Sequence, residues 1–432
     1  MGHNASKDLW RRAAKKIDNL HARCPDGPLL RELLARLYTV EEAELFVALP
    51  YVFSDLERIA RLSGVEPTAL RCRLERMCEK GLVIDIFADG RYFYMPSPMV
   101  IGVFEISMMR SAPDAELTQL AALFSAYLSG EFYAANVHQT SWARALPHEQ
   151  AIDETEHAQI LDYERASELV RSAEHHALGI CSCRHEKHHL GRRACETPLG
   201  VCASLGWCAE YMIRHGAARQ VSAEELLQTL DRSREQGLVF CADNVQQRAT
   251  FICQCCGCCC NLLRGISHYG YAQTVVTSNY IAENDRQLCS GCGQCIEACP
   301  IDAIELEIFR NEKGKKRGRA RVDRTLCLGC GVCALRCEKE SMRLVPREQR
   351  VLHPETTFER LILMSLQRGT LQNQLFDDPT SLTQEFMRGV LGAFLRLSPV
   401  KRALMSDALR SRFLAASRTA IKLSARPWLA EI

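Results

Sequence analysis

The sequence predicts a multidomain α+β protein in which helical segments at both ends flank a cysteine-rich middle. Its 432 residues leave room for two to four domains at roughly 100 to 200 residues each. Apolar residues recur at helical spacing near both ends, two β-rich runs precede the middle, and most of the 23 cysteines lie between Cys181 and Cys337. We expect four domains, over residues 1–110, 111–275, 276–350 and 351–432.

Charge and cysteine usage restrict the protein class. Lys and Arg number 54 against 52 Asp and Glu, so the formal net charge of +2 gives no chain-wide attraction to nucleic acid or anionic lipid. An odd cysteine count excludes a framework of disulfides alone. Residues 1–20 are polar and charged, without the apolar core of a signal peptide, and there is no apolar run long enough for a transmembrane segment. We therefore expect a cytoplasmic protein whose clustered cysteines bind metals or serve redox chemistry.

The N-terminal segment predicts three helices followed by a hairpin. The helices cover residues 40–49, 55–62 and 67–81, and two β-rich runs, 82–87 and 91–95, are joined by a turn at Asp89-Gly90. This order resembles the winged-helix branch of the helix-turn-helix group over residues 39–100. The resemblance implies that the helix beginning at Pro67 could enter a DNA major groove with its basic side chains, which are Arg71, Arg73, Arg76 and Lys80.

The charge of this segment argues against DNA as its ligand. Residues 1–95 contain 15 Lys and Arg against 14 Asp and Glu, and Glu75 and Glu79 share the helix with the basic residues. A DNA-binding module normally presents a basic face to the phosphates. We therefore favour protein docking or scaffolding over DNA binding.

Two cysteine runs carry the most specific motif in the chain. Residues 289–300 read C-x2-C-x2-C-x3-C-P, and residues 327–337 repeat the four-cysteine spacing, with Glu338 in place of the proline. Residues 276–347 thereby resemble bacterial two-cluster ferredoxins. The resemblance implies two [4Fe-4S] clusters with crossed ligation, one on Cys289, Cys292, Cys295 and Cys337, and the other on Cys327, Cys330, Cys333 and Cys299. Zinc is the alternative, because C-x2-C pairs also bind it, but two matching sets of four favour iron and sulfur.

The segment between the two runs, residues 309–321, is rich in basic side chains. The simpler interpretation is a solvated hairpin tip. The alternative is an electrostatic docking site for an acidic redox partner. The candidate docking residues are Lys313, Lys315, Lys316, Arg317 and Arg319.

Upstream cysteines predict one or two further metal centres. One would use Cys181, Cys183, Cys195 and Cys202, with zinc as an alternative to iron because His185, His188 and His189 lie nearby. The other would draw most or all of its ligands from Cys253, Cys255, Cys256, Cys258, Cys259 and Cys260. The CCG element in this run resembles the motif of heterodisulfide reductase catalytic subunits, which implies a noncubane cluster.

The sequence between and after these cysteines predicts helices. Apolar spacing favours one helix over residues 163–174, and Ser222 and Glu225 form a capping-box pattern for another over residues 224–235. The tail from residue 356 contains no cysteine and predicts two or three amphipathic helices. We expect the tail to pack on the rest of the chain, with contact to a partner or a membrane surface as the alternative.

The segments together favour an electron-transfer protein. Their order resembles that of multi-cluster iron-sulfur proteins of anaerobic metabolism, which implies a relay of low-potential electrons to or from a partner oxidoreductase. The alternatives are a reductase whose active-site cluster lies within residues 181–260, and a redox-sensing winged-helix transcription regulator. Neither a nucleotide-binding glycine motif nor a Walker loop is present in the sequence.

Overall fold

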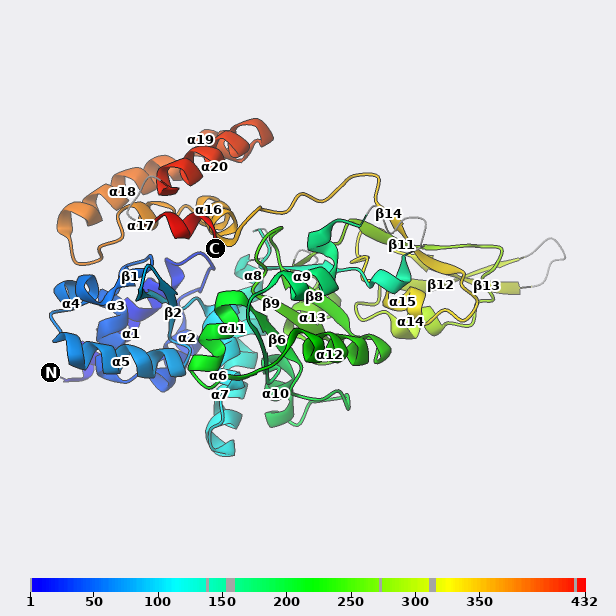
Figure 1. Ribbon diagram of the computed structural model, residues 1–432, viewed down its shortest axis with the longest axis horizontal. Helices are drawn as coiled ribbons and strands as arrows, with labels where there is room; N and C mark the ends of the chain where they lie inside the picture. Colours follow the sequence, from blue (N-terminus) through cyan, green and yellow to red (C-terminus); the bar gives the residue numbers. More distant parts are fainter. Residues whose placement is uncertain (1, 137–139, 153–159, 272–273, 311–315, 423–425) are drawn as a thin grey trace. The chain divides into compact units, whose positions relative to one another are not determined.

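The computed structural model describes the chain except for residues 1, 137–139, 153–159, 272–273, 311–315 and 423–425 (Figure 1). The chain forms two compact units. Unit 1 contains Met1–Thr140, Tyr211–Ala218 and Glu355–Ile432, and unit 2 contains Ser141–Glu210 and Arg219–Pro354. Both units therefore combine segments that are distant in the sequence, and the four predicted domain ranges remain predictions.

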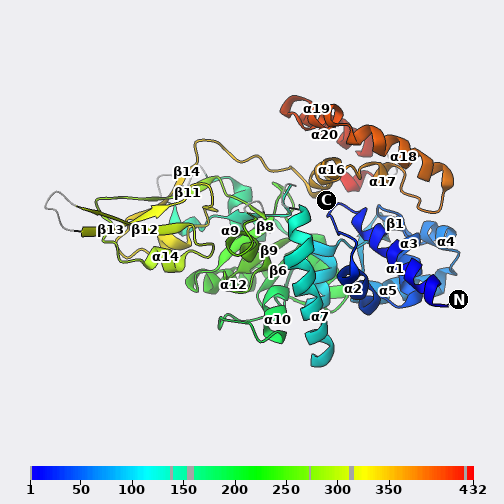
Figure 2. The same cartoon turned by 180° about the vertical axis from the view of Figure 1, so that it is seen from behind.

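Unit 1 begins with three helices that pack together. Helices α1 (Gly2–Asp18), α2 (Pro28–Leu37) and α3 (Val40–Ala48) lie side by side, with α1 against the other two (Figure 2). Thr39 and Glu42 form a capping box that fixes the start of α3. Leucines of α2 at helical spacing are buried on the shared face, which explains why this segment folds as a helix.

A hairpin unit follows. Strand β1 (Ser54–Asp55), helices α4 (Leu56–Ser63) and α5 (Pro67–Glu79), and strands β2 (Val83–Ala88) and β3 (Arg91–Pro96) come in this order, and the sheet order is β1-β3-β2. Asp89 and Gly90 occupy the turn with positive φ angles of 48° and 75°, which a type I′ turn requires. The helices and the turn lie close to their predicted positions, whereas the two-residue strand β1 was too short to predict.

The other described elements of unit 1 are helices and helical turns, although the turn at residues 99–103 contains extended backbone at Val100 and Ile101. They include η1 (Met99–Val103), α6 (Phe104–Met109), α7 (Asp114–Tyr127), η2 (Leu128–Phe132), α8 (Tyr133–Asn136), α16 (Thr357–Arg368), α17 (Gln372–Leu375), α18 (Leu382–Arg396), α19 (Ser398–Met405), α20 (Asp407–Lys422) and η6 (Pro427–Ala430). The tail helices share a small core of leucines and Ile362. One face of α18 stays exposed, with Phe386 69 % and Phe394 53 % accessible. Within the described part of the chain, no helix is long and apolar enough to cross a membrane.

Unit 2 is organised by a seven-stranded sheet among its described residues. The strand order is β10-β4-β8-β9-β6-β5-β7. The strands are β4 (Ala143–Leu146), β5 (His176–Gly179), β6 (Cys202–Leu205), β7 (Ala218–Gln220), β8 (Val239–Asp243), β9 (Phe251–Cys255) and β10 (Val275–Val276). The expectation of a helical cysteine-rich region was therefore wrong. These strands are short and carry Ala, Ser, Cys and Gln instead of the β-branched runs from which a strand is normally predicted.

Helices flank the strands of this sheet along the chain, and two of them lie close to the ranges predicted as helical, 163–174 and 224–235. The helices are α9 (Ala166–Ser172), α10 (Ser182–His189), α11 (Gly206–Arg214), α12 (Ala223–Glu235) and α13 (Asn261–Ser267), with short turns η3 (Glu149–Ala151) and η5 (Asp162–Glu164). Leu226 and Leu230 of α12 and Val170 of α9 pack on Leu205 and Ile252 of the sheet. Arg184 of α10 donates to the Gln254 carbonyl oxygen of β9, and α13 follows β9 after a five-residue turn, so both helices lie near the cysteine-bearing end of β9.

The C-terminal part of unit 2 contains the two ferredoxin-like cysteine runs. Strands β11 (Tyr280–Asn284) and β14 (Met342–Pro346) pair antiparallel, and β12 (Ile304–Arg310) and β13 (Lys316–Val322) form a second antiparallel pair. Short helices α14 (Gln294–Ala298) and α15 (Val332–Leu335) contact each other. The pairing of β11 with β14 brings the two halves of the repeat together.

Candidate iron-sulfur and thiolate sites

The first set of cysteines in the repeat comes from both of its halves. One cavity is lined by Cys289, Cys292 and Cys295, which precede or lie in α14, and by Cys337, which follows α15. Burial raises the pKa of Cys295 to about 11, and the nearby Cys289 and Cys337 thiolates add to this shift. Such mutual repulsion is relieved when a metal centre takes up the negative charge.

The second set mirrors the first. A separate cavity is lined by Cys327, Cys330, Cys333 and Cys299. Burial raises the pKa of Cys333 well above its ordinary value, with smaller contributions from the other three sulfurs. The structure therefore brings the eight cysteines together in the two crossed groups that the resemblance implies.

Backbone and hydroxyl donors surround these sulfurs. The Ala303 N–H donates to the Cys299 sulfur over 3.2 Å, and the Ser341 hydroxyl lies 3.3 Å from the Cys337 sulfur. Burial opposes ionisation of Cys289, but N–H groups of Ala320 and Gly291 outweigh it and lower the pKa. Donors of this kind stabilise thiolate ligands and the reduced form of a cluster. The donor set thus fits iron-sulfur ligation.

Glycine is required in the tight loop of the second set. Gly329 has a φ of +67°, and a Cβ built on it would lie 2.0 Å from the Tyr280 carbonyl oxygen. A side chain would therefore be strained in its backbone conformation and would also clash with fixed backbone. Glycine at this position therefore lets the loop between Cys327 and Cys330 pack directly against the backbone of Tyr280.

Upstream, strand pairing gathers cysteines that are far apart in the sequence. Strand β9 lies between β8 and β6, so Cys253 is directly opposite Cys241 of β8 and next to Cys202 of β6. The thiols of Cys202 and Cys255 are hydrogen-bond partners of Cys253 and are the largest causes of its raised pKa. Cys253 and Cys255 share one face of β9 because side chains alternate along a strand.

Two helix starts add further thiols to this group. Cys183 in the first turn of α10 and Cys260 at the start of α13 are hydrogen-bond partners, and Cys260 also faces Cys255. A buried network joins the two helices, in which Lys187 donates to Glu186 and Asn261 over 2.9 Å each. We call Cys183, Cys202, Cys253, Cys255 and Cys260 the strand-end thiols.

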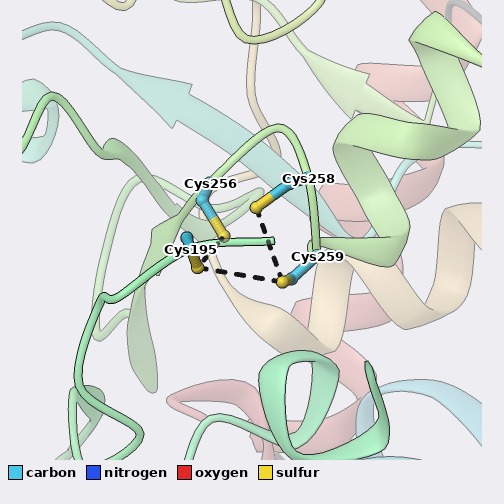
Figure 3. Close-up of side chains that lie close together, drawn as sticks. All are labelled: Cys195, Cys256, Cys258 and Cys259. Carbon is cyan, nitrogen blue, oxygen red and sulfur yellow. Dashed lines mark hydrogen bonds between the residues drawn. The ribbon is translucent and has the colours of Figure 1, made fainter. Parts of the chain in front are cut away.

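The remaining cysteines of the run form a different group. The sulfurs of Cys195, Cys256, Cys258 and Cys259 all lie within 4.8 Å of one another, and Figure 3 shows them pointing toward a common centre. The Cys195 sulfur is 3.7 Å from that of Cys256 and 3.9 Å from that of Cys259, and the Cys258 and Cys259 sulfurs are 3.5 Å apart. We call these residues the four-thiol group.

The structure thus groups the upstream cysteines differently from the prediction. The prediction placed Cys195 with Cys183 and Cys202, but in the structure the Cys195 sulfur lies with those of Cys256, Cys258 and Cys259. Cys202 is instead a hydrogen-bond partner of Cys253. The reason is topological, since the pairing of β6 with β9 links the two cysteine segments. The spacing of Cys253 and Cys255 by two residues indicates one strand face, but the neighbouring strand is not readable from sequence.

A buried arginine between the two groups was missed in the sequence. Arg184 is fully buried, lies beside the sulfurs of Cys181, Cys255 and Cys256, and donates to the Gln254 carbonyl oxygen over 2.5 Å. Thiols of Cys258 and Cys259 and then the Arg184 guanidinium hold the pKa of Cys256 far below its ordinary value. A buried cation in this place favours an anionic, thiolate-rich centre.

The upstream cysteines adjoin the second set. One buried cluster contains Cys255, Cys260 and Leu263 together with Ile301 and Val332 of the ferredoxin-like part, and Cys253, Cys299 and Cys330 pack against it. Gly257 lies so close to Pro300 that an added Cβ would be 2.6 Å from the Pro300 carbonyl oxygen. The cysteine-rich turn and the end of the first ferredoxin-like run therefore touch.

The basic residues of the hairpin differ in their surroundings. Lys313 and Lys315 lie outside the described residues. Arg319 forms an ion pair with Glu307 at 2.7 Å, whereas Lys316 and Arg317 are exposed at the start of β13. Part of the positive charge in this segment is thus neutralised across the strands.

A further group of possible ligands lies in unit 1. Ligand atoms of Cys78, Asp85 and His215 are within 4.8 Å of one another, and all three residues are buried. Asp85 already pairs with His215 at 2.9 Å and with Arg214 at 2.5 Å. The guanidinium supplies the positive charge that a metal would bring, so we interpret this group as an ion-pair network.

These sites define an iron-sulfur protein with a general role in electron transfer. Residues 288–341, which contain all eight cysteines of the two sets, match the family model described as a 4Fe-4S dicluster domain. No curated protein and no solved structure matches the chain.

Proposed function

We propose that the protein relays low-potential electrons through several iron-sulfur clusters to or from a partner oxidoreductase. The observation that carries this proposal is the crossed grouping of the two cysteine sets, each around its own cavity. In this proposal the first and second sets each hold a [4Fe-4S] cluster, which supplies one-electron chemistry when bound. The protein's own residues position the sulfurs, shield them from water and donate hydrogen bonds to them.

The strand-end thiols provide ligands for a third redox centre. They offer more sulfurs than one cubane needs, and three of them, Cys253, Cys255 and Cys260, share a buried cluster with Cys299 and Cys330 of the second set. Close packing of the two groups in one buried cluster favours electron exchange between neighbouring centres. The proposed path therefore runs from the strand-end thiols to the second set and then to the first.

The partner would dock at the far end of this path. The cavity of the first set is lined in part by Leu306 of β12 and Ala320 of β13, so the hairpin adjoins that set. Lys316 and Arg317 are the described candidates for contact with an acidic partner, and Lys313 and Lys315 belong to the same proposal. Arg319 contributes less because Glu307 neutralises it.

Paired substitutions test the crossed ligation in the full chain. Cys292→Ser combined with Cys337→Ser should alter one cluster, because both residues belong to the first set. Cys292→Ser combined with Cys299→Ser should alter both clusters. The measurement is the electron paramagnetic resonance spectrum of the reduced, anaerobically purified chain, together with its iron content.

Uncrossed ligation gives the opposite pattern, so the experiment has two clear outcomes. If each run of four cysteines held its own cluster, the Cys292→Ser, Cys299→Ser variant would alter one cluster. The Cys292→Ser, Cys337→Ser variant would then alter both clusters. Cys72→Ser is the matched control, since Cys72 is exposed on α5 and outside every thiol group. Its spectrum and iron content should equal those of the unmodified chain.

A reductase is the second candidate function. It is favoured by the surplus of strand-end thiols, which could leave an unusual cluster with an open or bridging position. In that case the chain alone would turn over a small molecule or a disulfide. A relay would be reduced and reoxidised without consuming a substrate.

The N-terminal hairpin unit is proposed as a winged-helix-like module that contacts protein. Lys80, the C-cap of α5, pairs with Glu42 at 2.7 Å, and Glu75 of α5 pairs with Arg214. These pairs reduce the basic charge available for phosphates, which disfavours the regulator hypothesis. A gel-shift assay at physiological salt should show no retarded DNA. The exposed face of α18 remains a candidate surface for a partner or a membrane.

A further inference from the structure

We propose that the four-thiol group, Cys195, Cys256, Cys258 and Cys259, binds a single Zn²⁺ ion in a closed tetrathiolate site. Zinc bound to thiolates has metal-sulfur distances of about 2.3 Å, so a regular tetrahedron places its sulfurs about 3.8 Å apart. Three sulfur–sulfur distances in the group are 3.5, 3.7 and 3.9 Å, and every pair lies within 4.8 Å. The sulfurs are thus spaced for one ion.

The same spacing disfavours an iron-sulfur cubane at these residues. In a cubane each cysteine binds a different iron, which keeps the four ligand sulfurs well beyond mutual contact. Here the sulfurs of the adjacent residues Cys258 and Cys259 are in contact at 3.5 Å. A single small ion accommodates two neighbouring ligands of this kind because both can reach one centre.

The surroundings match a negatively charged centre. Four thiolates exceed the charge of one Zn²⁺, and three arginines face the group. The Arg184 guanidinium lies beside the Cys256 sulfur, Arg193 donates to the Cys195 carbonyl oxygen over 2.9 Å, and Arg264 donates to that of Cys258 over 3.4 Å. Four sulfur ligands leave no open position, which is typical of structural zinc.

The position of Cys195 indicates what the ion would do. Residues 192–199 around it have no helix or strand, and the other three ligands lie in the turn between β9 and α13. Zinc would cross-link this loop to that turn within unit 2. Cys255, the last residue of β9, and Cys260, which directly precedes α13, flank these three ligands, so the ion would restrain the positions of two strand-end thiols. This role is separate from electron transfer.

The test is X-ray absorption at the zinc edge, which reports zinc independently of any iron in the full chain. The anaerobically purified protein should contain about one zinc, with four sulfur neighbours at about 2.3 Å. Cys258→Ser should lose most of the zinc. Cys195→His should retain zinc with three sulfurs and one nitrogen, because imidazole is a natural ligand of tetrahedral zinc. Cys72→Ser should behave as the unmodified chain.

Several results would overturn the proposal. They are a chain without zinc, zinc bound by oxygen or nitrogen in the unmodified protein, full zinc retention in Cys258→Ser, or an unchanged sulfur count in Cys195→His. The iron content of the variants is measured in parallel. Loss of zinc with the ferredoxin-like spectrum retained separates this site from the proposed electron-transfer function, and a folded chain is verified by its circular dichroism.

Discussion

Gly257 marks the point where the cysteine-rich turn touches the ferredoxin-like part. Its virtual Cβ would lie 2.6 Å from the Pro300 carbonyl oxygen and 3.1 Å from the Pro300 Cα. Gly257→Ala should therefore destabilise unit 2 by about 1–3 kcal/mol through overpacking against backbone. A lower thermal midpoint, measured anaerobically by circular dichroism, would show this. Gly200→Ala is the matched control, since no heavy atom lies within 4 Å of its virtual Cβ; equal losses in both variants would contradict the contact.

His353 gives unit 2 a dependence on pH. Burial and then Arg144 lower its pKa from 6.5 to about 3, and the ring is held by Asn244 over 2.7 Å. Because the unfolded chain binds the proton more readily, this stabilising contribution is complete above about pH 6.5 and declines as the pH falls toward 3. At pH 5.5 the loss should be about 1 kcal/mol.

Hydrogen exchange of the backbone near residues 244 and 353 checks this expectation. Local opening should become easier between pH 7.5 and 5.5 after correction for the intrinsic exchange rate. His353→Gln should remove that part of the pH dependence, because glutamine does not titrate. If the free energy of local opening depended on pH in the variant as it does in the unmodified chain, another group would be responsible.

At the scale of elements, the hairpin of β12 and β13 is where a partner should be recognised. Changing Lys316 and Arg317 to Glu should slow reduction by a small acidic ferredoxin about tenfold at low ionic strength, because attraction becomes repulsion. The difference should shrink as salt screens the charges. Stopped-flow rates at several salt concentrations measure it. Lys401→Glu, in α19 of unit 1, is the control. Reduction rates that do not depend on salt concentration in either variant would refute docking at the hairpin.

Local signals in the sequence were sufficient for several elements. The Ser222 and Glu225 pattern predicted a helix over residues 224–235, and α12 covers Ala223–Glu235 with the Ser222 side chain as its cap. The Asp89-Gly90 turn was equally clear because only a few residues adopt its backbone angles. The seven-stranded sheet was missed because its strands are short, and their pairing joins segments as far apart in the sequence as Ala143 and Val275.

At the scale of the whole molecule, the cysteines were predicted with uneven success. Spacing alone predicted an iron-sulfur repeat, since a four-cysteine pattern that occurs twice with this spacing is typical of two-cluster ferredoxins, and the match to a 4Fe-4S dicluster domain covers the same residues. Upstream, composition indicated metal ligands, but the division into strand-end thiols and a four-thiol group follows from the pairing of β6 with β9. Arg184 had no sequence signal, because a lone arginine is normally a surface residue.

A reductive titration of the intact, anaerobically purified chain, followed by electron paramagnetic resonance, tests the electron relay most directly. The account predicts reversible low-potential signals from the clusters of the first and second sets. It also predicts that the clusters are reduced and reoxidised without added substrate. The chain should contain at least about eight irons, four for each cluster of the repeat. A chain with no reducible cluster, or one whose signals appear only while a substrate is consumed, would contradict it.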